Sequence, residues 1–528
     1  MRITLYLGII LSLLTCNQVY AGNPDSDDLN RYEGMDYSTM LLRQNPAYRH
    51  WFNKTDNKGN LKISNMIEAH YNRSINEGDF LHYYGQNQDN YGIKAAGEHL
   101  YKIGSIYGEA AYSRGQSRDM EYNYCINPEL YYPYLVGDTL GRGLYTFEKY
   151  TIKGGYGFRT GKNFWGVEAK YEGVVGAKKT APKISNYDSW IHFNFAYART
   201  FGKALYSFRV YPEFNKQSIR AGEYKKNAVK YFQYYGFGNW NRKESIAGYG
   251  MGKQISIRGT GAEFSVHAPG KLAADNFTVL AGYRYHKMRT EENNYKELFN
   301  KDSHDVYAAG IMNWQRKTLE CELVLETQNQ LNHGTENVYQ NIEVSQEHNL
   351  YDYFKVGENK LYSLFQSNNR VFAHLKFHVS PRAYVNLVPK VSYTYYKESY
   401  KMPHNEIINS ALTPELRIGG GVKWKKNSID GGIQAAYKQP LQNVFDVAFT
   451  DAYMFNDLVR IPFEIRGEKS WTGEANLRYQ RSLKKRNAIG CSLHWSYLQR
   501  MDTPDACAQS FYSDRSVHNG EVKVFFLF

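Results

Sequence analysis

The strongest constraint on the fold is an alternation of apolar and polar residues that recurs along most of the chain. In residues 163–175, for example, Val167, Ala169 and Tyr171 alternate with charged residues. Side chains of an extended strand point to opposite faces in turn, whereas a helix repeats every 3.6 residues. The pattern therefore predicts β-strands that have one apolar face and one polar face.

The final residues of the sequence form a strand of the same kind. Val522, Val524, Phe526 and Phe528 share one face of residues 521–528. A soluble protein gains little from so apolar a terminus. A closed membrane barrel does gain from it, because its last strand must pair with the first and present an apolar face to lipid. We therefore expect an all-β, transmembrane, antiparallel β-barrel.

From about residue 60 onwards, segments of ~10–13 residues read as strands separated by turns or loops. These segments lie near 61–73, 90–101, 105–116, 146–158, 163–175, 188–200, 203–213, 229–242, 253–267, 276–288, 304–315, 317–328, 370–380, 383–396, 414–426, 429–438, 470–481, 487–498 and 517–528. Some of them should be hairpins within loops, and single-chain bacterial barrels usually have even strand numbers. We therefore expect about 16 strands, within a range of about 14–18.

Short joins between strands alternate with long connections. The joins near 102–104, 201–203, 380–382 and 427–428 look like tight turns, and the long connections are 117–145, 289–303, 329–369, 397–413, 439–469 and 499–516. Short periplasmic turns and long extracellular loops are typical of outer-membrane barrels. Several loops are rich in tyrosine, including Tyr122, Tyr124, Tyr131, Tyr132 and Tyr134. We expect these tyrosines to pack as a lid, with stacking on sugars as the alternative.

The N-terminus reads as a secretory signal peptide. Arg2 precedes an apolar stretch from Ile3 to Leu14, and cleavage after Ala21 fits the pattern. The alternative is a lipoprotein signal that ends at Cys16. The predicted organisation is a signal peptide at 1–21, a periplasmic or lumen-inserted segment at 22–58, and a barrel at 59–528. The expected location is the cell outer membrane.

Composition supports this class and excludes others. Mature residues include no apolar run of the ~18 that a spanning helix needs. Low mean hydropathy combined with 48 Tyr is typical of a barrel with a polar lumen, although a secreted carbohydrate-binding β protein is the alternative. The net charge of +13 comes from dispersed basic residues without a recognition motif, so we expect contact with lipopolysaccharide, or an electropositive lumen, and no nucleic acid.

The cysteines predict neither a metal site nor a disulfide framework. Cys125, Cys321, Cys491 and Cys507 match no zinc or disulfide spacing. Cys321 and Cys491 fall on apolar strand faces, whereas a bond between Cys125 and Cys507 stays open. No cofactor-binding motif occurs either, so we expect no cofactor and no metal.

Together these features resemble an outer-membrane β-barrel of Bacteroidota, and more narrowly a barrel family described only as a domain of unknown function. The strand that ends at Phe528 resembles the C-terminal signal of such barrels. Asn45-Pro46-Ala47 resembles a segment that enters the barrel in some of them. The resemblance implies contact with outer-membrane lipid and the barrel-assembly machinery, with a surface lipoprotein or a TonB-dependent receptor as further candidate partners. Residues 22–58 are too few for the full plug domain of such a receptor.

Charged residues recur on the polar strand faces and are the candidates for lining the lumen. They are Glu168, Lys170, Glu172, Arg284, His286, Glu320, Glu322, Glu326, His374, Lys376, His378, Arg417, Lys423, Lys425 and Arg478. Rows of opposite charge across a lumen can orient a polar solute. The alternative is that these charges pair with each other and close the lumen.

No catalytic site can be assigned. His494 and Ser496 share a strand face, as in outer-membrane phospholipases, but Tyr497 and Leu498 follow where that family has other residues. A Gly-x-Ser-x-Gly motif is also missing. The main hypothesis is therefore a pore or transporter for a polar solute. A non-conducting accessory or scaffold barrel, and a barrel hydrolase, are the alternatives.

Overall fold

The computed structural model describes most of the chain. The described residues are 37–55, 65–78, 80–101, 103–137, 142–179, 183–222, 229–237, 239–245, 252–270, 274–292, 296–345, 350–448, 455–483, 487–501 and 516–528. The predicted signal peptide and Cys507 lie outside them. No helix in this part of the chain is long and apolar enough to cross a membrane.

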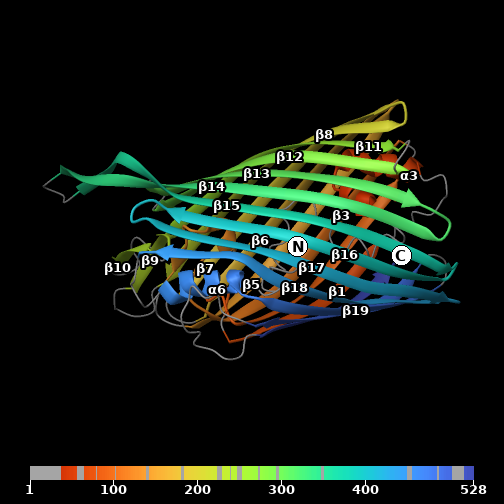
Figure 1. Cartoon of the computed structure of the whole chain (residues 1–528). Coiled ribbons are helices and arrows are strands. Elements are labelled where there is room, and N and C mark those ends of the chain that lie inside the picture. The colour runs from red at the N-terminus through yellow and green to blue at the C-terminus, as the bar shows by residue number, and fades with distance from the viewer. Residues whose placement is uncertain are drawn as a thin grey trace.

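Eighteen strands form one closed, antiparallel barrel (Figure 1). They are β1 (Met66–Glu77), β2 (Asn87–Leu100), β3 (Gly104–Met120), β5 (Gly143–Thr160), β6 (Asn163–Lys178), β7 (Lys183–Phe201), β8 (Ala204–Gly222), β11 (Lys253–Pro269), β12 (Asn276–Glu292), β13 (Lys296–Gln315), β14 (Leu319–Ser345), β15 (Leu350–Ser380), β16 (Ala383–Tyr400), β17 (Asn405–Trp424), β18 (Asn427–Val447), β19 (Ser470–Ser482), β20 (Ala488–Arg500) and β21 (Ser516–Leu527). Each pairs with its neighbours in sequence order.

The barrel closes where β1 pairs with β21. Tyr71 lies opposite Val522 in this pairing. The backbone N–H of Phe528 donates to the carbonyl of Asn65 at 2.9 Å, and the reverse bond measures 3.0 Å. Closure satisfies the backbone groups of both terminal strands, which is what a sheet surrounded by lipid requires.

The outer face is apolar, as the alternation predicts. Val522 and Val524 are 43% and 52% exposed on it, whereas Phe525 and Leu527 point inwards and are buried. Cys321 and Cys491 lie on the same outward face of β14 and β20. The predicted transmembrane barrel is therefore confirmed.

The strand number is 18, which is the upper limit of the expected range and two more than its central value of about 16. Each of the 19 predicted segments overlaps a strand among the described residues, and only 229–242 lies outside the barrel wall. It folds as the hairpin of β9 (Val229–Gly236) and β10 (Asn239–Ser245), which joins β4 (Val136–Gly137) in a separate three-stranded sheet.

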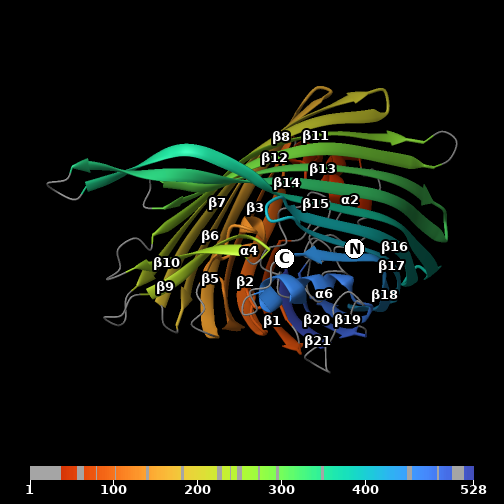
Figure 2. The same ribbon diagram turned by 60° about the vertical axis from the view of Figure 1, so that its left-hand side comes forward.

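Several strands also continue through residues that we predicted to be loops. Most of 329–369 belongs to β14 and β15, which contain 27 and 31 residues. Their outer parts, residues 337–345 and 350–361, pair only with each other, because pairing with β13 ends at Glu336 and pairing with β16 begins at Tyr362. This two-stranded ribbon projects beyond the barrel wall (Figures 1 and 2). A strand outside lipid needs no apolar face. The alternation of apolar and polar residues therefore fades in these parts of β14 and β15, although the two strands stay hydrogen-bonded to each other.

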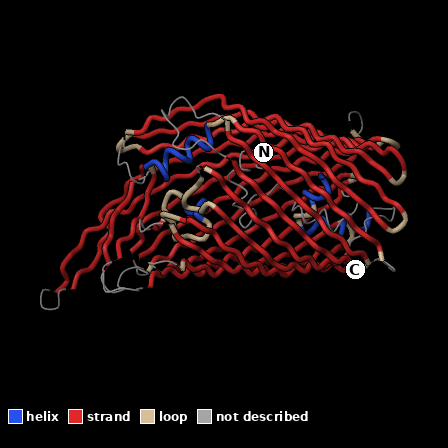
Figure 3. Tube along the Cα trace, turned by 90° about the horizontal axis from the view of Figure 1, so that it is seen from below, coloured by secondary structure: helices blue, strands red, loops and turns tan. Residues whose placement is uncertain are grey.

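The two ends of the barrel differ. At one end the strands are joined by tight turns, such as residues 202–203 and 381–382, and the terminal strand ends there. At the other end lie the long connections. Both ends enclose helices inside the ring of strands, as Figure 3 shows. The helices are α2 (Tyr37–Leu42) and α3 (Pro46–Thr55) towards the tight turns, and α4 (Pro128–Tyr131), η2 (Asn456–Arg460) and α6 (Ile461–Gly467) towards the long connections.

Candidate functional site

Residues 37–55, which we call the N-terminal plug, lie inside the lumen. Their anchor is a buried cluster in which the Glu98 carboxylate of β2 accepts from Arg43 at 2.5 Å and from Arg49 at 3.3 Å. The guanidinium of Arg49 also lies 3.7 Å from the centre of the Tyr107 ring. A buried charge is tolerated only when it is paired, so these contacts fix the plug to β2 and β3.

Polar contacts attach the plug to the opposite part of the wall as well. Asn45 donates to the Ser207 hydroxyl at 2.8 Å, and the hydroxyls of Tyr48 and Ser265 lie 3.0 Å apart. On β14, Glu322 accepts from the backbone N–H groups of Tyr37 at 2.8 Å and of Ser38 at 3.2 Å. The plug therefore contacts β2, β3, β8, β11 and β14.

The other end of the lumen is filled by a cap, which we define as residues 80–86, 121–137, 229–237 and 455–467. Its core is aromatic, and Tyr131 and Tyr134 are fully buried in it. The Tyr131 hydroxyl bonds Asn215 of β8 at 2.8 Å, whereas the Tyr132 hydroxyl donates to Glu398 of β16 at 2.7 Å. Five strands separate β8 from β16 in the barrel order. Residues 121–137 therefore cross the lumen, and the predicted tyrosine lid is present.

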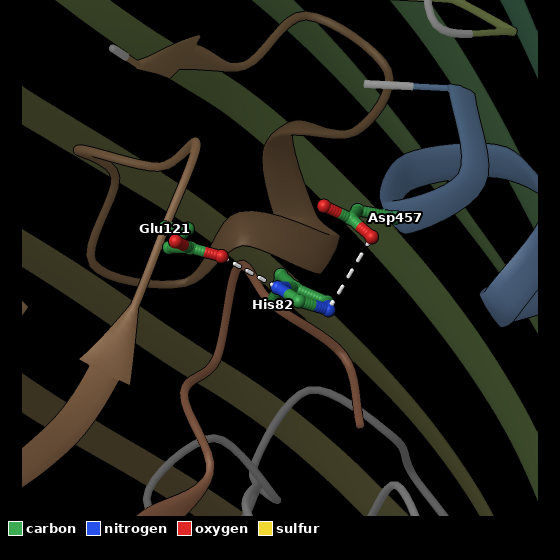
Figure 4. A group of neighbouring side chains, drawn as sticks. All are labelled: His82, Glu121 and Asp457. Carbon is green, nitrogen blue, oxygen red and sulfur yellow. Dashed lines mark hydrogen bonds and ion pairs between the residues drawn. The ribbon is translucent and has the colours of Figure 1, made fainter. Parts of the chain in front are cut away.

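Three parts of the cap meet at the side chain of His82 (Figure 4). Nδ1 of His82 lies 2.7 Å from a carboxylate oxygen of Glu121, and Nε2 lies 3.5 Å from one of Asp457. The Asp457 carboxylate also accepts from the Tyr122 hydroxyl at 2.8 Å. His82, Glu121 and Asp457 could together offer ligand atoms to a metal ion, since these atoms lie within 4.8 Å of one another. As arranged, however, each ring nitrogen faces its own carboxylate, so His82 acts as a clamp between segments of the cap.

A cavity of about 300 Å³ lies beneath the cap, on the side that faces the plug. Such a volume is at the lower end of the range of small-molecule sites. Residues 123–132 of the cap form its roof, and side chains from at least eleven strands form its wall. The wall is rich in amides, which include Gln328, Gln330, Asn332, Gln366 and Asn368.

The charged groups around this cavity have protein partners. Lys149 lies 3.4 Å from Glu172, and Arg284 lies 3.0 Å from Asp305. Lys301 donates to two backbone carbonyls of the cap, at 2.6 and 2.8 Å. An ionic group that is already paired offers little to a charged ligand.

One carboxyl group of the roof is different. Glu129 of α4 lines the cavity and is exposed to it, but the surrounding protein keeps bulk solvent away, and this desolvation raises its pKa from the usual 4.5 to about 7. It is therefore largely protonated under mildly acidic conditions. A protonated carboxyl group can both donate and accept a hydrogen bond.

Several polar atoms of residues that line the cavity lack a hydrogen-bond partner among the described residues. They include Nε1 of Trp190 and the side-chain oxygens of Asn332 and Asn368. Trp190 and Asn332 are each only 4% exposed. These atoms are covered by neighbouring protein atoms, so a ligand in the cavity reaches them only if the surrounding side chains move.

Most of the predicted lumen residues point into the barrel, but they pair with neighbours on the wall. The pairs are Glu168 with Lys153, Glu172 with Lys170, Arg284 with Asp305, His286 with Glu213, Glu320 with Lys376 and His378, Glu322 with His374, and Glu326 with Arg370. Adjacent strands supply both partners in most of these pairs. The charges therefore do not stand as free rows facing each other across an open lumen.

The remaining predicted residues lie on β17 to β19. Arg417 is 3.5 Å from the Asn476 oxygen, and Arg478 donates to Gln480 at 2.8 Å. Lys423 points inwards but is exposed near the strand end. Lys425 was wrongly placed in the lumen. It lies in the tight turn after Trp424, with a positive φ of 51°, because β17 ends two residues earlier than we expected.

The residues that matter most to the cavity were missed. Gln328, Gln330 and Asn332 alternate on β14, opposite Asn368 and Gln366 of β15. This period-two pattern of amides was visible in the sequence. It was not recognised because most of it falls in 329–369, which we interpreted as a loop.

The pair that suggested a hydrolase is not arranged for catalysis. Ser496 and His494 both face the lumen from β20. The Ser496 hydroxyl is fully buried and has no hydrogen-bond partner among the described residues. A nucleophilic serine needs a base within hydrogen-bond reach, and His494 does not provide one here.

Comparison with known proteins identifies a family. A family model described as "Family of unknown function (DUF6850)" matches residues 59–528. No curated protein matches the chain. Among solved structures, the outer membrane transporter YddB from Escherichia coli is 8% identical, with a TM-score of 0.41 over 89% of this chain and 81% of that one. BauA, the ferric preacinetobactin receptor from Acinetobacter baumannii, is 7% identical, with a TM-score of 0.37 over 88% and 79%.

Proposed function

We propose that this chain, which belongs to the family of unknown function DUF6850, is an outer-membrane transporter that admits a small polar solute through a gated lumen. The observation that carries the proposal is the lumen cavity beneath the cap, on which amide side chains of the wall converge. A scaffold needs no such cavity, whereas a transporter that captures its solute before release does. The solute enters when the cap opens and leaves when the plug moves.

The plug is not part of the sheet, so it can leave the lumen without breaking the wall. It touches the wall through polar groups, such as Arg43 with Glu98, and through apolar clusters in which Leu41 and Leu42 are buried. Lumen water can solvate the polar groups once the plug leaves, whereas exposure of the apolar side chains opposes its release and keeps it seated in the closed state. The barrel wall is hydrogen-bonded independently of the plug and stays closed.

Osmotic swelling of liposomes tests passage of solute. The variant to compare with the wild type combines Glu98→Gln with replacement of residues 121–142 by a Gly/Ser turn of about four residues. This turn can join β3 to β5, because Met120 pairs with Gly143. We expect slow swelling of wild-type liposomes in glucose, glycine and sodium citrate, and faster swelling in at least one solute with the variant. A correctly folded variant that passes none of them would overturn the proposal.

One observation favours an accessory barrel as the second candidate. Residues 337–345 and 350–361 form the projecting ribbon, which exposes Val338, Phe354 and Val356. A ribbon with free strand edges can accept a strand from another protein. Purification in mild detergent distinguishes this role, since a stable partner should copurify with the wild type and be lost when the ribbon is shortened to a tight turn. Equal recovery of a partner with both chains, or of none with either, would count against it.

A further inference from the structure

We infer that the cavity binds a neutral carbohydrate of one or two sugar rings, an inference that rests on the proposed transport function. The first support is the chemistry of the wall. Gln328 lies opposite Asn368, and Gln330 lies opposite Gln366, so four amides adjoin on two strands. Each amide has both a donor and an acceptor. Sugar hydroxyls also donate and accept, and a row of them matches such a surface.

Aromatic rings lie beside these amides. Tyr396 of β16 is next to Gln366 in the strand register, and Tyr132 reaches the cavity from the cap. Tyrosine combines an apolar ring with a polar hydroxyl. Its ring can pack on the C–H face of a sugar while the hydroxyl stays in the polar network.

The electrostatics of the cavity disfavour a charged ligand. Glu172 lies between Lys149 and Lys170, and Arg284 pairs with Asp305. Arg466, which also lines the cavity, lies 4.0 Å from the centre of the Tyr396 ring and donates to Asn409. Lys301 is bound to two carbonyls of the cap. A strongly ionic ligand would have to break such pairs, and their partners would then be left buried without compensation.

The size of the cavity limits the ligand. A volume of about 300 Å³ equals roughly ten waters, at ~30 Å³ each in the liquid. One or two sugar rings fit this space while the cap is closed. A longer chain would require the cap to stay open.

Equilibrium dialysis of the full-length protein in detergent tests the inference, with labelled glucose, galactose, maltose and cellobiose as neutral probes and labelled citrate as the ionic probe. The test variant is Asn368→Leu. The matched control is Asn386→Leu, which makes the same change on the neighbouring strand, on the lumen side but outside the cavity. We expect saturable binding of at least one neutral sugar. Affinity should fall about tenfold in Asn368→Leu and stay unchanged in Asn386→Leu.

The outcomes separate the ligand class from the transport function. Binding of citrate without any sugar, or sugar binding that both asparagine variants retain equally, would overturn the carbohydrate inference. The swelling assay uses the variant that combines Glu98→Gln with replacement of residues 121–142. If this variant passes solutes, the transport proposal stands even when the carbohydrate inference fails. If it passes no solute while the wild type binds a sugar, the transport proposal fails and the binding site stands. Thermal melting of both variants shows whether each one is folded.

Discussion

The backbone of Ala47 packs directly against Gly166 of β6. A β-carbon added to Gly166 would lie 2.3 Å from the Ala47 nitrogen and 2.4 Å from the carbonyl carbon of Pro46. Both are backbone atoms at the start of α3, so a side chain at this position cannot be accommodated by a rotamer change. The glycine therefore lets the N-terminal plug touch the barrel wall.

Gly166→Ala should accordingly unseat the plug and leave the barrel intact. Hydrogen exchange of residues 37–55 should increase, while the heat-dependent shift in gel mobility typical of a folded barrel persists. Gly154→Ala on β5 is the matched control, because its added β-carbon meets no atom within 4 Å. Equal exchange of the plug in both variants would show that the contact does not hold it.

The anchor at Glu98 gives a second prediction. Its carboxylate is buried between Arg43 and Arg49, and loss of one partner of a buried ion pair leaves the other charges uncompensated. Glu98→Gln should weaken docking of the plug by about 3 kcal/mol, measured by hydrogen exchange of residues 37–55. Glu358→Gln serves as the control, since its pairs with Lys355 and Lys360 are exposed on the ribbon. A plug that is protected equally in both variants would contradict the anchoring role.

The cap should loosen as pH rises. Burial raises the pKa of Glu129 to about 7 in the closed cap, whereas an opened cap should restore the usual 4.5. Below pH 4.5 the carboxyl group is protonated in both states, so the closed cap keeps its full stability. As pH rises towards 7, only the open state loses its proton, and opening becomes easier. Above about pH 7 Glu129 is ionised in both states, so its contribution to the stability of the closed cap no longer changes with pH.

Hydrogen exchange of residues 121–137 checks this prediction after correction for the intrinsic pH dependence. Protection in the wild type should decline between pH 4.5 and 7 more steeply than in Glu129→Gln, which cannot ionise. The two proteins differ only at residue 129, so the difference in slope belongs to Glu129. Identical slopes would mean that ionisation of this carboxyl group is not coupled to opening of the cap.

The His82 clamp should also hold the cap together. It joins residues 80–86 to Glu121 and Asp457 through both ring nitrogens. His82→Ala removes these contacts, and we expect faster proteolysis within the cap and a loss of about 1–2 kcal/mol in its local stability. His404→Ala is a suitable control, because His404 is exposed and lies 3.9 Å from Asp446. Unchanged cleavage of the cap in His82→Ala would rule out the clamp.

The sequence was sufficient for the barrel but not for what fills it. Lipid-facing residues such as Val522 and Val524 alternate in a way that only a strand can produce, so the wall could be predicted. The contact of Tyr37 with Glu322 joins residues far apart in the chain, and no local pattern encodes it. The amides of β14 were missed for another reason, since a strand outside lipid needs no apolar face. Lys425 was misplaced because a strand boundary, unlike an alternation, leaves little trace in a single sequence.

The most direct test of the central claim, that two separate obstacles close one solute path, is planar-bilayer conductance of four proteins. These are the wild type, Gly166→Ala, the chain with residues 121–142 replaced by a short turn, and the chain that carries both changes. Obstacles in series predict background conductance for the first three and stable channels only for the last. Full conductance of the wild type, or no conductance of the folded double variant, would contradict the account.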